Sequence, residues 1–131
     1  MPDEGTLDAI TTAAPHGVQW RLTAPRRSGS KPEEAARRAN CEPLLHAGVQ
    51  IDGFREGLLL SKPVTVHRPL ALVTTGNLDR RSFEIRFEPC NLAYDSDLGS
   101  QARLLQRSYE DASGPVDAER WARRPLWWRA I

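Results

Sequence analysis

Three polar side chains flank two short apolar runs in the middle of the chain, and their types could bind an anion. Lys62 carries a positive charge, while Thr75 and Asn77 can donate hydrogen bonds from a hydroxyl and an amide. The apolar residues are 58–60 with 64–66 before a short turn and 70–73 after it, and Lys62 lies within the first of these stretches. This pattern is typical of two adjacent buried strands. The sequence therefore predicts a hairpin with these donors around it.

The spacing of these residues resembles a motif of the phospholipase D superfamily. That motif runs histidine, any residue, lysine, four residues, aspartate, six residues, Gly-Ser, any residue, asparagine. The chain keeps the spacing without insertion or gap, with Lys62 and Asn77 at the lysine and asparagine positions. Leu60 stands at the histidine position, His67 at the aspartate position and Thr74–Thr75 at the Gly-Ser position. The motif is therefore degenerate.

Segments along almost the whole chain resemble the bacterial cardiolipin synthase branch of that superfamily. They are residues 2–4, 26–28, 44–49, 77–83, 94–97 and 121–127. The resemblance implies an α/β fold, namely a single phospholipase D-like half with a mixed β-sheet flanked by helices. We expect residues 1–131 to form one such domain, the C-terminal half of a two-half enzyme, with a tail over 119–131 rich in tryptophan and arginine.

The resemblance also implies a chemistry. Two halves meet so that one histidine attacks the phosphodiester phosphorus and forms a phosphohistidine, while the other protonates the leaving alcohol. Lysines and asparagines hold the phosphoryl oxygens. In cardiolipin synthases the acceptor is the glycerol hydroxyl of a second phosphatidylglycerol, and neither metal nor cofactor is implied. Lys62, Asn77 and Thr75 are therefore the candidate site residues.

A chain with this motif is expected to be truncated and catalytically impaired, since Leu60 can neither carry a proton nor form the phosphoenzyme. Losing one general acid or base typically removes about 10² to 10⁴ in rate. His67 is a poor substitute because the strand rise places it roughly 20 Å from the Leu60 position, and His16 lies outside the motif. Lys62 and Asn77 also have readings without a ligand. Lys62 would then be a surface lysine on an edge strand, and Asn77 would be a turn residue.

Three hypotheses for function follow. The first is a cardiolipin synthase-like phosphatidyltransferase half that is inactive by itself. The second is a non-catalytic module that binds an anionic lipid or phosphodiester. The third is a domain that forms a homodimer or pairs with a separate first-half domain. A phosphatidylglycerol-like phospholipid is the partner that the resemblance implies.

Composition and charge indicate the size of the domain and the kinds of partner that are disfavoured. The chain has 131 residues, of which 40% are hydrophobic, which suits one domain with a modest core. A net charge of +1 and the lack of a basic face with interleaved aromatics before the C-terminus do not favour nucleic acid. Cys41 and Cys90 have no metal-site spacing and are predicted to be free buried thiols in a reducing compartment.

The sequence contains no signal peptide and no apolar run of about 18 residues. We expect a cytoplasmic chain without a transmembrane segment. The segment from Trp121 to Trp128 alternates arginines with tryptophans. It could either pack its indoles on the domain or lie on the inner membrane as a peripheral contact. The loop from Arg26 to Pro32 is likewise either a solvated connector or a headgroup-facing loop.

Periodicity predicts the remaining elements. Helices are expected over residues 2–14, 32–46, 97–108 and 116–124, and strands over residues 18–22, 49–54 and 83–94. The strand over 83–94 should bury an alternating apolar face and lie at an edge or bulge at Pro89. His46, near a helix end, is expected to interact with the last carbonyls rather than with a metal.

Overall fold

The computed structural model describes residues 2–26, 31–57, 59, 61–67, 69–77, 82, 84–85 and 87–123, with no side-chain description for 31–36, 38, 120 and 122. Its elements, in chain order, are α1 (Glu4–Ala13), η1 (Ala14–His16), β1 (Arg21–Pro25), α2 (Lys31–His46), β2 (Gln50–Phe54), β3 (Lys62–Val66), β4 (Leu70–Thr74), β5 (Cys90–Tyr94), α4 (Ser96–Asp111), β6 (Ser113–Pro115) and α5 (Ala118–Ala122). The α/β class and the hairpin are confirmed.

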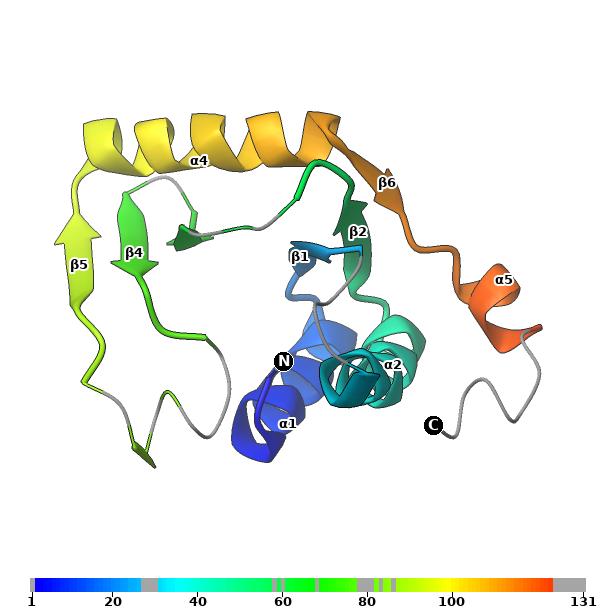
Figure 1. Ribbon diagram of the computed structural model, residues 1–131. Coiled ribbons are helices and arrows are strands. Elements are labelled where there is room, and N and C mark those ends of the chain that lie inside the picture. The colour runs from blue at the N-terminus through cyan, green and yellow to red at the C-terminus, as the bar shows by residue number, and fades with distance from the viewer. Residues whose placement is uncertain are drawn as a thin grey trace.

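The strands form two sheets rather than one. The first sheet has the order β1-β2-β6, with β1 parallel to β2 and β6 antiparallel to it, and is therefore mixed as expected. The second sheet is the antiparallel meander β3-β4-β5. Helix α4 runs across both sheets, whereas α1 and α2 lie on the opposite side of the first sheet from α4 (Figure 1).

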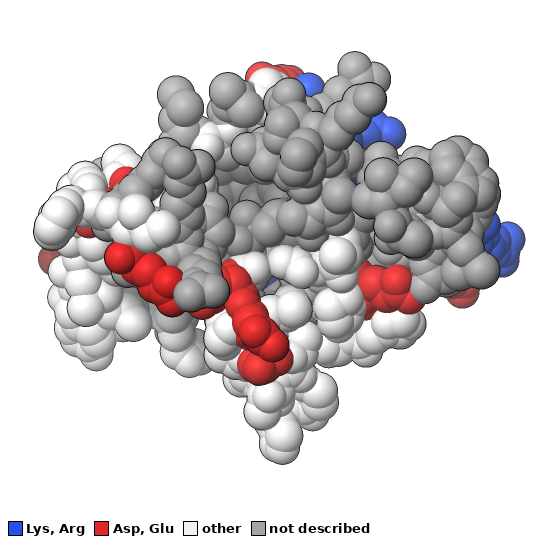
Figure 2. Space-filling view, turned by 60° about the horizontal axis from the view of Figure 1, so that its bottom comes forward, with Lys and Arg blue, Asp and Glu red and all other residues white. Residues whose placement is uncertain are grey.

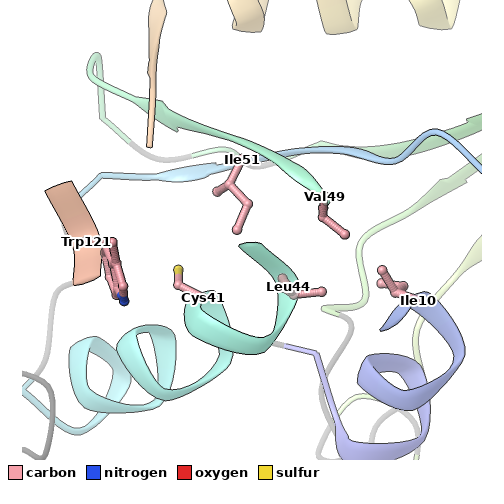
Figure 3. Close-up of a cluster of buried hydrophobic side chains, with 6 residues drawn as sticks. All are labelled: Ile10, Cys41, Leu44, Val49, Ile51 and Trp121. Atoms are coloured by element: carbon pink, nitrogen blue, oxygen red, sulfur yellow. The ribbon is translucent and has the colours of Figure 1, made fainter. Parts of the chain in front are cut away.

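The core lies on the side of the first sheet that faces α2. Figure 3 shows its six buried side chains, which come from α1, α2, β2, its preceding residue and α5: Ile10, Cys41, Leu44, Val49, Ile51 and Trp121. Leu44 is fully buried, and Trp121 lies beside Cys41. The first tryptophan of the predicted tail therefore packs on the domain. Residues 124–131 lie outside the described residues.

Helix α4 is attached to each sheet by polar side chains. Gln106 Nε2 donates to the Pro63 carbonyl at 2.9 Å, and its Oε1 accepts from the Thr65 hydroxyl at 2.8 Å. On the first sheet, Arg21 Nη1 donates to Glu110 Oε2 at 2.5 Å, and its Nε lies 3.4 Å from Asp52 Oδ2. These contacts hold two small sheets to one helix.

The predicted strand over 83–94 is wrong in its first half. Ser82 and Glu84 are helical, and the predicted inward residues Ile85 and Phe87 are exposed, whereas Phe83 lies outside the described residues. The strand begins at Cys90, directly after Pro89, and β5 is an edge strand.

Other differences are smaller. The first strand begins three residues later than predicted, α4 is longer at both ends, and the strand β6 was not predicted. Cys41 is buried as predicted, but Cys90 is exposed, so that part of the thiol prediction is wrong. Within the described part of the chain, no helix is long and apolar enough to cross a membrane.

Candidate functional site

The register of the hairpin brings Lys62 and Thr75 together. Lys62 is the first residue of β3 and pairs with Thr74, the last residue of β4. The half-buried Lys62 side chain reaches along this end of the sheet, and its Nζ donates to the Thr75 carbonyl at 3.3 Å. The ammonium therefore lies beside the Thr75 main chain, at a place that we call the Lys62 end of the hairpin.

The chain leaves the Lys62 end through a tight turn that contains Asn77. Thr74 Oγ1 accepts from the Gly76 N–H at 2.9 Å and donates to the Pro89 carbonyl at 3.2 Å. A Cβ on Gly76 would lie 3.3 Å from Glu88 Cβ, so the turn has little room for a side chain there. The Asn77 N–H donates to Ser82 Oγ at 3.1 Å. Asn77 directly follows the bend at Thr75 and Gly76, and its side chain is exposed.

Glu88, which the sequence analysis did not single out, also lies at the Lys62 end. Its Oε2 accepts from the Thr75 hydroxyl at 2.7 Å, and the residue is half-buried. A glutamate thirteen positions after a threonine belongs to no helical or strand spacing, so only the fold reveals this contact. The carboxylate engages the hydroxyl proton that an anionic ligand would need, and it adds a negative charge next to Thr75.

His67 lies at the opposite end of the hairpin. It is exposed in the turn between β3 and β4 and has a left-handed φ of 53°. It follows Lys62 by five positions, which corresponds to about 17 Å along an extended strand. The structure therefore separates His67 from Lys62, Thr75 and Asn77. Leu60, at the motif's histidine position, lies outside the described residues.

The other histidines lie outside this site. His16 Nδ1 is 2.7 Å from the Thr12 carbonyl, at the end of the first helical segment. His46 is in the last turn of α2, where Ala47, Gly48 and Val49 N–H groups bond to the final carbonyls. Among the described residues, no group of three or more His, Cys, Asp or Glu side chains is arranged to hold a metal ion.

A small apolar cavity lies elsewhere in the fold. Leu22, Cys41, Leu44 and Ile51 line it, between the first sheet and α2, and none of the motif residues reaches it. On the face that Figure 2 shows, described acidic side chains form a broken band, and described lysines and arginines lie near the margins. The described part of that face therefore offers no basic surface to an anionic membrane.

Comparison with known proteins identifies relatives by sequence and by fold. No family model matches the chain. Cardiolipin synthase A of Yersinia pseudotuberculosis serotype O:1b (strain IP 31758) is 42% identical over 129 residues, which cover 98% of this chain and 26% of that protein. Cardiolipin synthase A of Klebsiella pneumoniae (strain 342) is 41% identical over 131 residues, which cover 100% and 27%. The chain thus spans about a quarter of the length of the curated relatives it matches.

The fold has a solved counterpart. The crystal structure of Nuc, a phospholipase D family member from Salmonella typhimurium, superposes with a TM-score of 0.75 over 88% of this chain and 76% of that one. At 10% identity, this similarity concerns the fold alone. The sequence relatives and the fold agree with the resemblance of the motif and of the segments around it. Over nearly its whole length the chain is thus homologous to part of cardiolipin synthase A, and it has the fold of a phospholipase D family member.

Proposed function

We propose that this chain carries a degenerate phosphodiester site of the cardiolipin synthase type. It binds a phosphatidylglycerol-like headgroup through Lys62, Thr75 and Asn77, and it does not transfer the phosphatidyl group by itself. The observation that carries the proposal is the contact between Lys62 Nζ and the Thr75 carbonyl. It places the lysine ammonium beside the main chain of Thr75, the residue that carries the candidate hydroxyl and stands two positions before Asn77.

Binding requires that phosphate displace weak contacts within the site. One contact of the ammonium is the neutral Thr75 carbonyl at 3.3 Å, and a phosphate oxygen offers it a charge-assisted bond. The Thr75 hydroxyl must leave Glu88 before it can donate to the ligand. The carboxylate then repels the bound anion, so affinity is expected to be modest and to fall as salt is added.

Turnover needs groups that this end of the hairpin lacks among its motif residues. A nucleophile and a general acid must both reach the phosphorus, and leucine replaces the motif histidine. His67 is about 17 Å along the strand from Lys62, beyond hydrogen-bond reach of a phosphate bound there. The site therefore favours binding without transfer, with peripheral association with the membrane as its consequence.

The experiment has two readouts on the purified chain. Sedimentation with vesicles of phosphatidylglycerol and phosphatidylcholine should show binding that weakens with salt and falls several-fold in Lys62→Ala. Arg107→Ala, which removes one positive charge from an exposed position on α4, is the matched control and should leave binding nearly unchanged. Equal losses in both variants would mean that net charge, not the site, retains the lipid.

The second readout is transfer from labelled phosphatidylglycerol. We expect no product above background for the wild type. Turnover that disappears in Lys62→Ala would mean that another histidine or an assembled second copy completes the site, and the proposal of an inactive half would be withdrawn. Binding and transfer are scored separately, so either half of the proposal can fail alone.

A further inference from the structure

We propose that Arg26 and Arg55 form a phosphate-binding site at the carboxyl ends of β1 and β2. The site takes the phosphate group of either a free phosphate compound or a lipid headgroup. It is separate from the phosphodiester site proposed at the Lys62 end of the hairpin and does not depend on it. The inference rests on the register of the strands, on two glycines beneath the arginines and on the counter-ions of the described residues.

The register of the parallel strands places the two arginines side by side. Pro25 pairs with Phe54 at the end of the ladder, and the Arg26 N–H donates to the Phe54 carbonyl at 2.8 Å. Continuing this register by one residue puts Arg26 beside Arg55, on chains about 4.8 Å apart. The carboxyl ends of neighbouring parallel strands are a frequent place for ligands in α/β sheets.

Both side chains lie on the α2 side of the sheet, over a pair of glycines. Gly53 of β2 pairs with Gly114 of β6, so a Cβ on either one would point to the same face. A Cβ on Gly53 would lie 3.7 Å from Arg26 Cβ and Cγ, and a Cβ on Gly114 would lie 3.0 Å from Arg55 Cζ. By strand alternation this is also the face of Ile51, which packs in the core beside α2.

The contact with Gly114 positions the Arg55 guanidinium. The guanidinium occupies the space that a side chain at position 114 would fill, so only a glycine allows this placement. A group that is already positioned loses less conformational freedom when it binds a ligand. Arginine can also donate two parallel N–H bonds to the oxygens of one phosphate group. The site therefore offers a pre-positioned guanidinium with a second one beside it.

The described carboxylates do not neutralise this pair. Both arginines are exposed, and neither side chain has an ion pair or a hydrogen bond with a described residue. Asp52, on the same strand, lies on the other face, where its Oδ2 is 3.4 Å from Arg21 Nε. Neighbouring like charges repel each other, and an anion between them relieves the repulsion. A phosphate monoester, which carries a charge of about −1.5 to −2 at neutral pH, matches two guanidinium groups.

The test uses inorganic phosphate as the probe and the Lys62→Ala chain as the background, so the proposed phosphodiester site does not contribute. At constant ionic strength, phosphate should shift the NMR signals of the Arg26 and Arg55 Nε–H groups to saturation, whereas chloride should not. Arg26→Ala and Arg55→Ala should each weaken binding about tenfold, the equivalent of one charge-assisted hydrogen bond. Arg107→Ala, at an exposed position on α4, is the matched control and should leave binding unchanged.

Gly114→Ala separates position from charge. The new methyl group displaces the Arg55 guanidinium but removes no charge, and the backbone tolerates alanine because Gly114 has no left-handed φ. Phosphate binding should fall several-fold while the urea midpoint stays close to that of the parent chain. Binding that is unchanged in Gly114→Ala would mean that net charge alone attracts the anion, and the proposal of a positioned site would be withdrawn.

Vesicles of phosphatidic acid and phosphatidylcholine identify the source of the phosphate group. If the ligand is a lipid headgroup, the Lys62→Ala chain should sediment with these vesicles, and Arg55→Ala should reduce the bound fraction several-fold. If the ligand is a free phosphate compound, inorganic phosphate should bind while the vesicles do not retain the chain. A phosphate response that does not saturate, or one that survives both arginine substitutions, would overturn the proposal.

Discussion

Asp3 links the stability of α1 to pH. Its Oδ1 accepts from the Thr6 N–H at 2.9 Å and caps the helix. Hydrogen bonds from the Thr6 side chain, and then from its backbone N–H, lower the pKa of the Asp3 carboxyl from its ordinary value of 3.8. Because the pKa is lower in the folded chain, the carboxylate stabilises it at pH values above 3.8. That stabilisation is lost as the pH falls through the folded pKa.

Asp3→Asn should separate the cap from its charge. Asparagine caps a helix about as well as aspartate but does not titrate. We expect the urea midpoint of the wild type, relative to the variant, to decrease as the pH is lowered from about 6 to about 2. A parallel pH dependence in both proteins would show that other carboxyl groups, not Asp3, control the acid sensitivity.

At the same scale, residue types predicted only some of the contacts at the Lys62 end of the hairpin. Lys62 and Thr75 do lie together, as expected if the motif spacing reflects one hairpin end. Glu88 could not be predicted, because its contact depends on where the turn after β4 returns the chain to the sheet. The exposure of Cys90 was missed for a related reason: a thiol on an uncovered sheet face has the same local sequence as a buried one.

At the scale of elements, the Gln106 side chain joins α4 to the second sheet. Both halves of its amide are bonded, one to the Pro63 carbonyl and one to the Thr65 hydroxyl. Gln106→Ala leaves both partners without this bond, and should lower the free energy of unfolding by about 1–3 kcal/mol. Gln101→Ala, at an exposed position on α4, should change it by less than about 0.5 kcal/mol. Equal effects in urea unfolding would contradict this role.

Elements with a strong local signal were predicted, and elements that depend on distant partners were not. Apolar runs on either side of a proline-containing turn predicted β3 and β4, and periodicity predicted α2 and α4. The strand β6 consists of Ser-Gly-Pro, which has little strand propensity, and exists because it pairs with Asp52 to Phe54. The division into two sheets is likewise absent from the pattern, since periodicity reports which face is apolar but not which strands pair.

Burial is uneven over the whole molecule. The main buried cluster lies around α1, α2, β2 and α5, whereas Ala71 is the one buried side chain described in the strands β3, β4 and β5. Strands with few buried apolar contacts open locally at a lower free energy than the core. The second sheet should therefore exchange its amide hydrogens without global unfolding, while α4 remains attached to the first sheet through Arg21 and Glu110.

Native-state hydrogen exchange tests this on the monomeric chain. The amides of Val64 and Leu72, which face each other across β3 and β4, should exchange through a step that responds weakly to urea. The Ile51 amide, in the strand beside the core, should exchange only through a strongly urea-dependent global step. Leu44→Ala, which empties a fully buried position, should lower the opening free energy at Ile51 by about 2–5 kcal/mol. The opening free energies at Val64 and Leu72 should not change, provided that global unfolding still costs more free energy than local opening. Equal opening free energies at all three sites would instead mean that α4 couples both sheets into one cooperative unit.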